Sequence, residues 1–348
     1  MDKHILITIT IVASISSILA NEGNDCKWNR YKEFQVCNGV LTAVRPRRSH
    51  LELDVREFSS IAPNAFQGVE ISRLELLGDR KGPRCTPKIF ELQLEGFETL
   101  SKITDLELDC LEFPVGHNPF RSFKELQRLV LERIDFKKLS AEFFTDFPKL
   151  NHLGLYYSNI TTISEDTLSK IPEKLSTLVI LSGFREIKLK AFRRFTNLQR
   201  LHVTHGNLAS ISADMFDGLH QLRTLDLQGN SIEELAPATF QGLPNLVRLV
   251  LSDNKIDKLT AGVFDNLHNL EELSLISNGI SIIPTQIFEG SSKLRFFNVQ
   301  FNRIREIEPT AFSGLRLAKL DMTGNPMKII AKNKFVGLQD ARIIFSKE

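Results

Sequence analysis

The sequence is poor in cysteine, tryptophan and tyrosine, and it carries little net charge. Its 348 residues include 4 Cys, 1 Trp and 3 Tyr against 25 Phe, and the formal net charge is +2. This balance argues against nucleic acid or an anionic membrane as a partner, because both attract strongly basic chains. The excess of Phe over the other aromatic residues indicates one structural role that is used many times.

Short motifs that carry catalysis or bind cofactors are also missing. The sequence contains no G-x-S-x-G, no Walker phosphate-binding loop, no H-E-x-x-H and no glycine-rich dinucleotide fingerprint. It has no C-x-x-C spacing, which argues against zinc. His202 and His205 fall on an expected strand and its exit, where their side chains face opposite ways. We therefore expect no enzymatic activity, no cofactor and no metal.

Residues 1–20 contain the one long apolar run. It extends from Ile5 to about Leu19 behind Lys3 and His4, and Ala20 offers a small residue for cleavage. This pattern is typical of a secretory signal peptide. The alternative is an uncleaved membrane anchor, but the run is interrupted by Ser and Thr and is short for a span of about 20 apolar residues. We expect a secreted, extracellular chain with no membrane span after cleavage.

A motif of the form L-x-x-L-x-L-x-x-N-x-I recurs along the chain. Its most regular copies contain Asn230, Asn254, Asn278, Asn302 and Asn325. The first apolar residue of each copy falls at Ile71, Ile103, Leu126, Leu150, Leu175, Leu198, Leu222, Leu246, Leu270, Leu294 and Leu317. After one longer first gap the period is about 24 residues, a regularity that marks an internal repeat.

Each part of the motif has a physical reason. Alternate leucines fall on one face of a short strand, so stacked repeats predict a parallel sheet. The Asn can donate and accept hydrogen bonds in the following turn, where backbone groups have no water. One Phe per repeat fills the outer side of the array, and Leu168 stands where one is missing. These are Phe66, Phe97, Phe120, Phe144, Phe192, Phe216, Phe240, Phe264, Phe288, Phe312 and Phe335.

On this motif the chain resembles the extracellular leucine-rich-repeat family. The resemblance implies an α/β repeat fold, a horseshoe-shaped solenoid of about eleven or twelve repeats over residues 48–348. Its concave side would be a parallel β-sheet and its convex side irregular or short-helical. Residues 21–47 would form an N-terminal cap, because the first strand otherwise exposes its edge and its core.

The 4 cysteines are Cys26, Cys37, Cys85 and Cys110. An even number behind a signal peptide indicates two disulfides, and sequence alone leaves three pairings open. Chain positions favour Cys26–Cys37 within the cap. They also favour Cys85–Cys110, which would hold the Gly- and Pro-rich loop at 78–87 beside the next strand.

The two ends of the array differ from its middle. Before Leu222 the place of the Asn is taken by Ile134, Ser158, Gly183 and Gly206, which indicates either selection for a ligand or drift that a stable array tolerates. At the C-terminus no cysteine-bearing cap follows. Ile343–Phe345 is expected to add an apolar edge strand, either shielded by Arg342 and Lys347 or in contact with a partner.

Residues between the inward leucines should point out of the concave sheet. On the middle strands they combine an apolar centre with a rim of hydrogen-bond donors, which is typical of an interaction site. The candidate residues are Arg128, Val130, His152, Tyr156, Val179, Leu181, Arg200 and His202. A plainer interpretation is that β-branched and aromatic residues simply suit strands. Asn159, in the sequon Asn159-Ile160-Thr161, is predicted to be glycosylated.

Two hypotheses of function follow. The first is a secreted module that binds a protein or glycan partner through its concave face, without catalysis. The second rests on a faint similarity to the leucine-rich non-catalytic subunit of shrimp luciferin monooxygenases and related arthropod secreted proteins, which implies a regulatory or stabilising subunit of a secreted enzyme. Neither hypothesis names the ligand or the oligomeric state.

Overall fold

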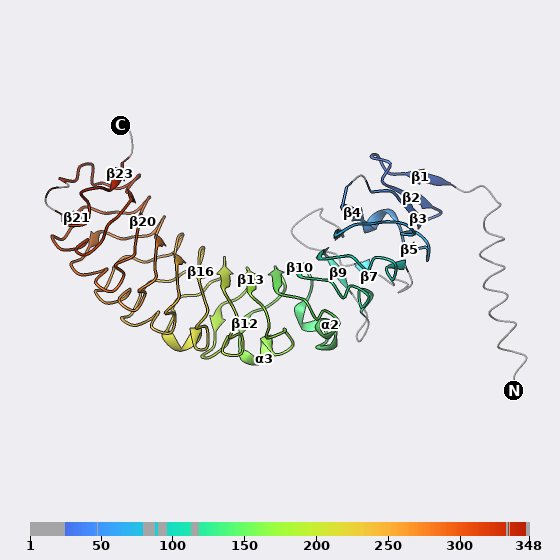
Figure 1. Ribbon diagram of the computed structural model, residues 1–348, viewed down its shortest axis with the longest axis horizontal. Coiled ribbons are helices and arrows are strands. Elements are labelled where there is room, and N and C mark those ends of the chain that lie inside the picture. The colour runs from blue at the N-terminus through green and yellow to red at the C-terminus, as the bar shows by residue number, and fades with distance from the viewer. Residues whose placement is uncertain are drawn as a thin grey trace, which may run out of the picture.

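The computed structural model describes residues 25–46, 48–78, 88–89, 96–112, 118–331, 333 and 335–345. The chain winds into an arc whose inner side carries one strand per repeat, while α2 (Glu142–Thr145) and α3 (Glu165–Leu168) lie on the outer side (Figure 1). Residues 1–20, Cys85 and Lys347 lie outside the described residues. The signal peptide and the Cys85–Cys110 pair therefore stay predictions.

The inner strands form a single 13-stranded sheet that follows chain order. Every neighbouring pair is parallel, and Leu225, Leu249 and Leu273 stack in one column as the repeat predicts. The array begins with β4, one repeat before the first predicted anchor, Ile71. The strands are β4 (His50–Asp54), β6 (Arg73–Leu77), β8 (Asp105–Asp109), β10 (Arg128–Glu132), β11 (His152–Tyr156), β13 (Thr177–Leu181), β15 (Arg200–Thr204), β16 (Thr224–Asp226), β17 (Arg248–Val250), β18 (Glu272–Ser274), β20 (Phe296–Asn298), β22 (Lys319–Asp321) and β23 (Arg342–Ile344).

The convex side holds only short elements, as the repeat pattern predicts. Two-stranded parallel pairs join neighbouring repeats: β7 (Lys88–Ile89) with β9 (Leu111–Glu112), β12 (Thr162–Ile163) with β14 (Glu186–Ile187), and β19 (Ile282–Ile283) with β21 (Glu306–Ile307). Single 3-10 turns are η1 (Val55–Glu57), η3 (Phe136–Lys138) and η4 (Ala213–Phe216). Strands on the inner side of the arc lie closer together than the elements on the outer side, so the stack curves toward its sheet (Figure 1).

The five regular asparagines form what we call the Asn ladder (Asn230, Asn254, Asn278, Asn302 and Asn325). All but Asn278 are less than 9% exposed. Asn254 Nδ2 donates to the carbonyls of Leu227, Leu251 and Ser252 at 3.1 Å, and its Oδ1 accepts from Ile232 N at 3.1 Å. One side chain thus ties its own turn to the preceding repeat, which satisfies buried backbone groups.

The repeated phenylalanines pack one above another behind the sheet, most regularly in the C-terminal half. In the C-terminal half Phe216, Phe240, Phe264, Phe288 and Phe312 stack ring on ring, with centroids 5.9–6.5 Å apart. Leu168 is fully buried where the column lacks a Phe. The column accounts for the unusual number of Phe residues.

The N-terminal cap is a 4-stranded sheet, β1 (Cys26–Trp28), β2 (Phe34–Cys37), β3 (Val40–Val44) and β5 (Ser60–Ile61). The antiparallel pairing of β1 with β2 sets Cys26 opposite Cys37, and the two form the predicted disulfide. β3 then pairs in parallel with β5, which comes from the first repeat. This pairing joins the cap to the array.

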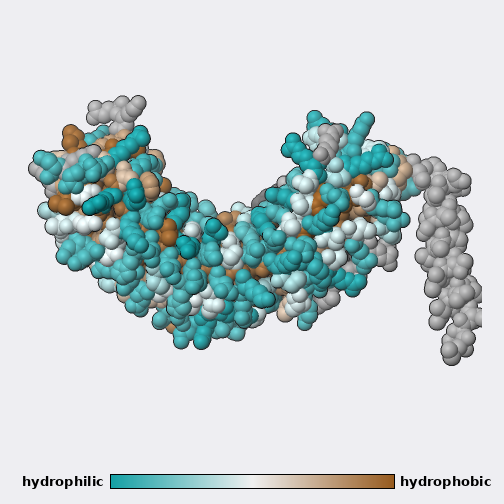
Figure 2. All heavy atoms as spheres, in the orientation of Figure 1, coloured by the Kyte–Doolittle hydropathy of each residue, from teal (hydrophilic) through white to brown (hydrophobic). Residues whose placement is uncertain are grey.

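At the other end β23 pairs in parallel with β22, so the predicted edge strand exists. Ile343 and Phe345 pack against the core, while Ile329 is 83% and Val336 66% exposed nearby. Figure 2 shows hydrophilic side chains over most of the molecule and a gathering of apolar ones at this end. The C-terminal edge is therefore only partly covered within the described residues.

Candidate functional site

The predicted site residues lie side by side on β10, β11, β13 and β15. The strands pair in register, so Arg128, His152, Thr177 and Arg200 form one row across the sheet. A second row holds Val130, Gly154, Val179 and His202, and a third holds Glu132, Tyr156, Leu181 and Thr204. We call the predicted residues of these rows, with Gly154, the central patch.

Gly154 decides how Tyr156 lies within the central patch. A Cβ at Gly154 would come within 3.2 Å of Tyr156 Cε1 and 3.2 Å of Val130 Cγ2. The tyrosine ring therefore lies back over the glycine and against Val130, in a space that any larger residue would fill. Val130 is fully buried, which corrects the prediction that it is exposed on the concave face.

The exposed apolar surface of the patch comes from Tyr156, Val179 and Leu181, each of them half-buried. Burial raises the pKa of the Tyr156 hydroxyl, because the ionised form loses solvation. Within the described residues no hydrogen bond of that hydroxyl is found, so it can bond to a ligand. The patch thus presents a held aromatic ring with one polar end.

Neighbouring strands neutralise part of the predicted basic rim. Arg128 Nη1 lies 2.8 Å from Asp105 Oδ1 on β8, and His202 Nδ1 lies 3.3 Å from Asp226 Oδ2 on β16. Arg200 is exposed and forms no ion pair with any residue that the structure describes. The rim therefore offers one unpaired cation, fewer than the sequence suggests.

His152 has a ring nitrogen without a hydrogen-bond partner in the part of the chain that the structure describes. Its Nε2 is buried and has no hydrogen-bond partner among the described residues. Burial lowers its pKa, and the positive charge of Arg128 lowers it further. His152 is thereby held in its neutral form at ordinary pH.

Acidic and basic side chains on the N-terminal strands form a mixed ion-pair network. Arg73 Nη2 lies 2.6 Å from Glu75 Oε1 and 3.3 Å from Glu107 Oε2, and His50 Nε2 lies 3.1 Å from Glu75 Oε1. Burial raises the pKa of Glu107, and the neighbouring Glu75 carboxylate raises it further. These side chains are therefore paired with one another instead of being available to a ligand.

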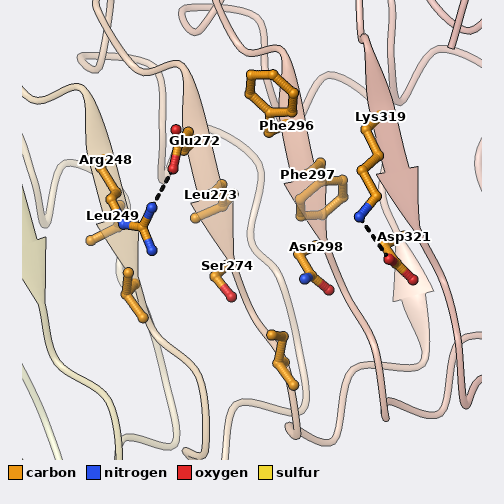
Figure 3. A pocket seen from close by; sticks show the side chains of 12 residues that line it. Arg248, Leu249, Glu272, Leu273, Ser274, Phe296, Phe297, Asn298, Lys319 and Asp321 are labelled. Carbon is orange, nitrogen blue, oxygen red and sulfur yellow. Dashed lines mark hydrogen bonds and ion pairs between the residues drawn. The ribbon is translucent and has the colours of Figure 1, made fainter. Parts of the chain in front are cut away.

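Sequence reasoning missed a second hollow on the concave sheet, over β17, β18, β20 and β22. Its volume is about 350 Å³, and Phe296, which lines it, is 44% exposed. Figure 3 shows Phe296 on the strand between two ion pairs, Arg248 with Glu272 on one side and Lys319 with Asp321 on the other. The signal in the sequence was a Phe at an outward position of L-R-F-F, where other repeats carry polar residues.

No cation site or membrane span is found in the part of the chain that the structure describes. There, no three His, Cys, Asp or Glu side chains gather closely enough to hold a metal ion. No helix within the same residues has the length and apolar character to cross a bilayer.

The repeat geometry agrees with a family model. The Leucine rich repeat model matches residues 174–232, 196–256, 221–280, 244–304 and 269–327, in overlapping windows. This protein is a leucine-rich-repeat protein. The matched windows lie in the regular part of the array and include the whole Asn ladder.

Solved structures share the fold of this leucine-rich-repeat protein. The mouse RP105/MD-1 complex aligns with a TM-score of 0.66 and 19% identity, over 83% of this chain and 53% of that chain. The Drosophila Toll–Spatzle complex aligns with a TM-score of 0.62 and 14% identity, over 90% of this chain and 50% of that one. The TLR13–ssRNA13 complex aligns with a TM-score of 0.55 and 18% identity, over 85% of this chain and 60% of that chain.

This leucine-rich-repeat protein thus spans between 50% and 60% of the length of those three chains. At such identities the likeness concerns the fold alone. No curated protein matches the sequence. Function has to be argued from the surface of this chain.

Proposed function

We propose that this protein is an extracellular recognition module that binds a protein or glycan partner through the central patch. The observation that carries the proposal is the packing of Tyr156 over Gly154, beside the partly exposed Val179 and Leu181. An aromatic ring that is already held in place loses little conformational entropy on binding. Structures of the same fold are complexes with Spatzle, MD-1 or RNA, which supports a binding role.

The extracellular part of the proposal rests on several features. The Cys26–Cys37 disulfide fits an oxidising compartment. Asn159, in the predicted sequon, is exposed in a turn and so accessible to a glycan. Residues 1–20 would be the cleaved signal peptide, 21–47 the cap and 48–348 the array. N-terminal sequencing and glycosidase treatment of the secreted protein test cleavage and glycosylation.

The decisive experiment removes the aromatic ring. After a partner is isolated by pull-down from the native extracellular fluid, Tyr156→Ala should weaken its binding by about 2 kcal/mol or more, with an unchanged melting temperature. Gly154→Val should weaken binding as well, because it displaces the ring without deleting it. Phe296→Ala is the matched control, an aromatic truncation on the same sheet at the second hollow, and should have a smaller effect.

The outcomes separate the hypotheses. If Tyr156→Ala binds like the wild type while a substitution on the convex side abolishes binding, the central patch is not the site. If the isolated partner is an enzyme in fixed stoichiometry, the protein is a non-catalytic subunit, and the same variants show whether the patch holds the complex together.

A further inference from the structure

A group of cations lines the flank of the array near its C-terminal end. Lys293, Arg295 and Arg316 surround one hollow of about 500 Å³, together with Glu271 and Ser292. All three basic side chains are exposed, and they come from the segments that lead into β20 and β22. We call this site the basic hollow. It adjoins β20, whose Phe296 lines the second hollow on the concave sheet.

Two residues of the basic hollow hold a repeat position that is ion-paired in some of the upstream repeats. At the residue before the first leucine, upstream repeats pair acid with base: Lys102 with Glu70 and Lys149 with Glu125, each at 2.6 Å. In the basic hollow Lys293 and Arg316 hold this position. Lys293 Nζ donates to an amide, Asn269 Oδ1, at 2.7 Å.

Within the described residues, no carboxylate lies within salt-bridge distance of Lys293, Arg295 or Arg316, although Glu271 lines the same hollow. The whole chain has a net charge of only +2, so this is a local concentration of charge. Whereas Lys102 and Lys149 are paired with carboxylates on this flank, three cations are available together here. Such a group attracts a ligand that carries several negative charges.

The other groups at the site favour a sugar as the carrier of those charges. The Glu271 carboxylate and the Ser292 hydroxyl accept hydrogen bonds from hydroxyl groups, which a carbohydrate offers in number. A nucleic acid or a lipid headgroup layer offers fewer hydroxyl groups to Glu271 and Ser292 than a carbohydrate does. The disulfide in the cap also fits the compartment that contains sulfated polysaccharides.

We propose that the basic hollow binds a sulfated glycan, with Lys293, Arg295 and Arg316 bound to sulfate groups and Glu271 and Ser292 to sugar hydroxyls. This site is separate from the central patch and does not depend on the function proposed for it. It gives the protein a second attachment, to the polysaccharide of the extracellular surroundings.

The test measures binding of the full mature protein to a size-defined heparin oligosaccharide by calorimetry. Arg295→Ala/Arg316→Ala should raise the Kd roughly tenfold and lower the slope of log Kd against log salt concentration, because fewer counterions are released. Arg303→Ala/Arg305→Ala is the matched control. It removes the same charge from the same repeats, but its residues follow β20 instead of leading into it, and its Kd should stay near that of the wild type.

Three results would overturn the proposal. One is equal loss in both double variants, which would mean that only net charge matters. Another is equal binding of a fully desulfated oligosaccharide. The third is tighter binding of a single-stranded oligonucleotide of the same charge, which would make nucleic acid the ligand. Tyr156→Ala should leave heparin binding unchanged, so failure here and failure of the central patch are distinguishable.

Discussion

The two halves of this solenoid differ in how they satisfy the backbone hydrogen-bonding groups of the turn that follows each inner strand. From β16 to β22 the inner strands have three residues and each is followed by an Asn of the ladder. From β4 to β15 each inner strand has five residues, and the ladder position that follows it holds no Asn. In the first set the Asn side chain donates hydrogen bonds to the carbonyls of the turn. In the second set the hydrogen bonds between neighbouring strands continue for two more residues.

The N-terminal half fills the Asn position with unrelated groups. Ser158 Oγ donates to the carbonyls of Leu131 and Tyr156 at 3.1 Å, two of the bonds that an Asn would make. At Gly206 the buried Phe184 ring takes the space, since a Cβ there would lie 2.2 Å from Phe184 Cε2. The ladder is thus one solution among several to the satisfaction of buried backbone groups.

The difference has a functional consequence. A five-residue strand presents three outward residues, as His152, Gly154 and Tyr156 do on β11, whereas a three-residue strand presents two. The concave sheet is therefore wider in the N-terminal half. The third row of that wider sheet supplies Tyr156 and Leu181, so the central patch exists because the Asn ladder stops short of it.

The largest effect should come from the phenylalanine column of the regular half. Phe264 stacks 6.3 Å from Phe240 and 5.9 Å from Phe288, and it is fully buried. Phe264→Ala should reduce the free energy of unfolding by about 3–5 kcal/mol, because it opens a cavity that neighbouring rings cannot fill. Phe264→Leu should cost less, as the buried Leu168 of the irregular half indicates. Urea denaturation measures both, and equal losses would show that a Leu cannot replace the stacked ring in the regular half.

The disulfide at the irregular end should have the next largest effect. Cys26 and Cys37 are 11 residues apart in sequence and close the hairpin of the cap. Cys26→Ser/Cys37→Ser should destabilise the protein by about 2–4 kcal/mol, since the unfolded cap regains chain entropy. Hydrogen exchange should rise first at β1–β3 and remain slow at β16–β22. A uniform rise would mean that the cap and the regular half unfold together.

Removal of the turn side chains compares the two solutions directly. Asn254→Ala should destabilise the protein by about 1–3 kcal/mol, because buried carbonyls and one N–H lose their partner. Ser158→Ala removes two hydrogen bonds instead of four and should cost about 1 kcal/mol. Thermal unfolding checks both. If Ser158→Ala costs as much as Asn254→Ala, the number of bonds is not what stabilises the turn.

The smallest expected effect concerns pH. The folded protein lowers the pKa of His152 below its ordinary value of 6.5, so below that pH the unfolded chain takes up the proton first. Stability should therefore fall as the pH drops through 6.5 and level off below the lowered pKa of the folded state. His152→Gln should lose this part of the pH dependence. His268→Gln, at an exposed histidine of the regular half, is the control, and denaturation midpoints at several pH values measure the difference.

Most of the fold could be predicted from the chain alone, because each repeat states its own pattern. Leu225 and Leu227 are two residues apart and therefore face the same side of a strand. Leu249 and Leu251 repeat this spacing 24 residues later, in the next strand. The cap disulfide and the edge strand at Ile343 could also be predicted, since both follow from the need to cover the ends of a sheet. Cysteine pairing beyond the cap and processing at Ala20 stay predictions.

The candidate site was only partly predictable. Tyr156 was identified from its type and its row, but its position over Gly154 depends on a missing side chain beside it and on Val130 one repeat away. The charge on Arg128 is neutralised by Asp105 from the preceding strand. Exposure and charge on a sheet depend on neighbours across strands, which periodicity along the chain does not describe.

By itself the sequence determined the architecture of this protein: a solenoid with one inner strand, one turn and one buried Phe or Leu per repeat. These features depend on the alternation of apolar and polar residues within each copy of the motif and on the regular spacing between copies. Only the tertiary structure decided which outward residues remain available, because side chains about 24 residues apart come into contact only when the repeats stack. That contact buried Val130, paired Arg128 and His202, and left Lys293, Arg295 and Arg316 without carboxylates among the described residues.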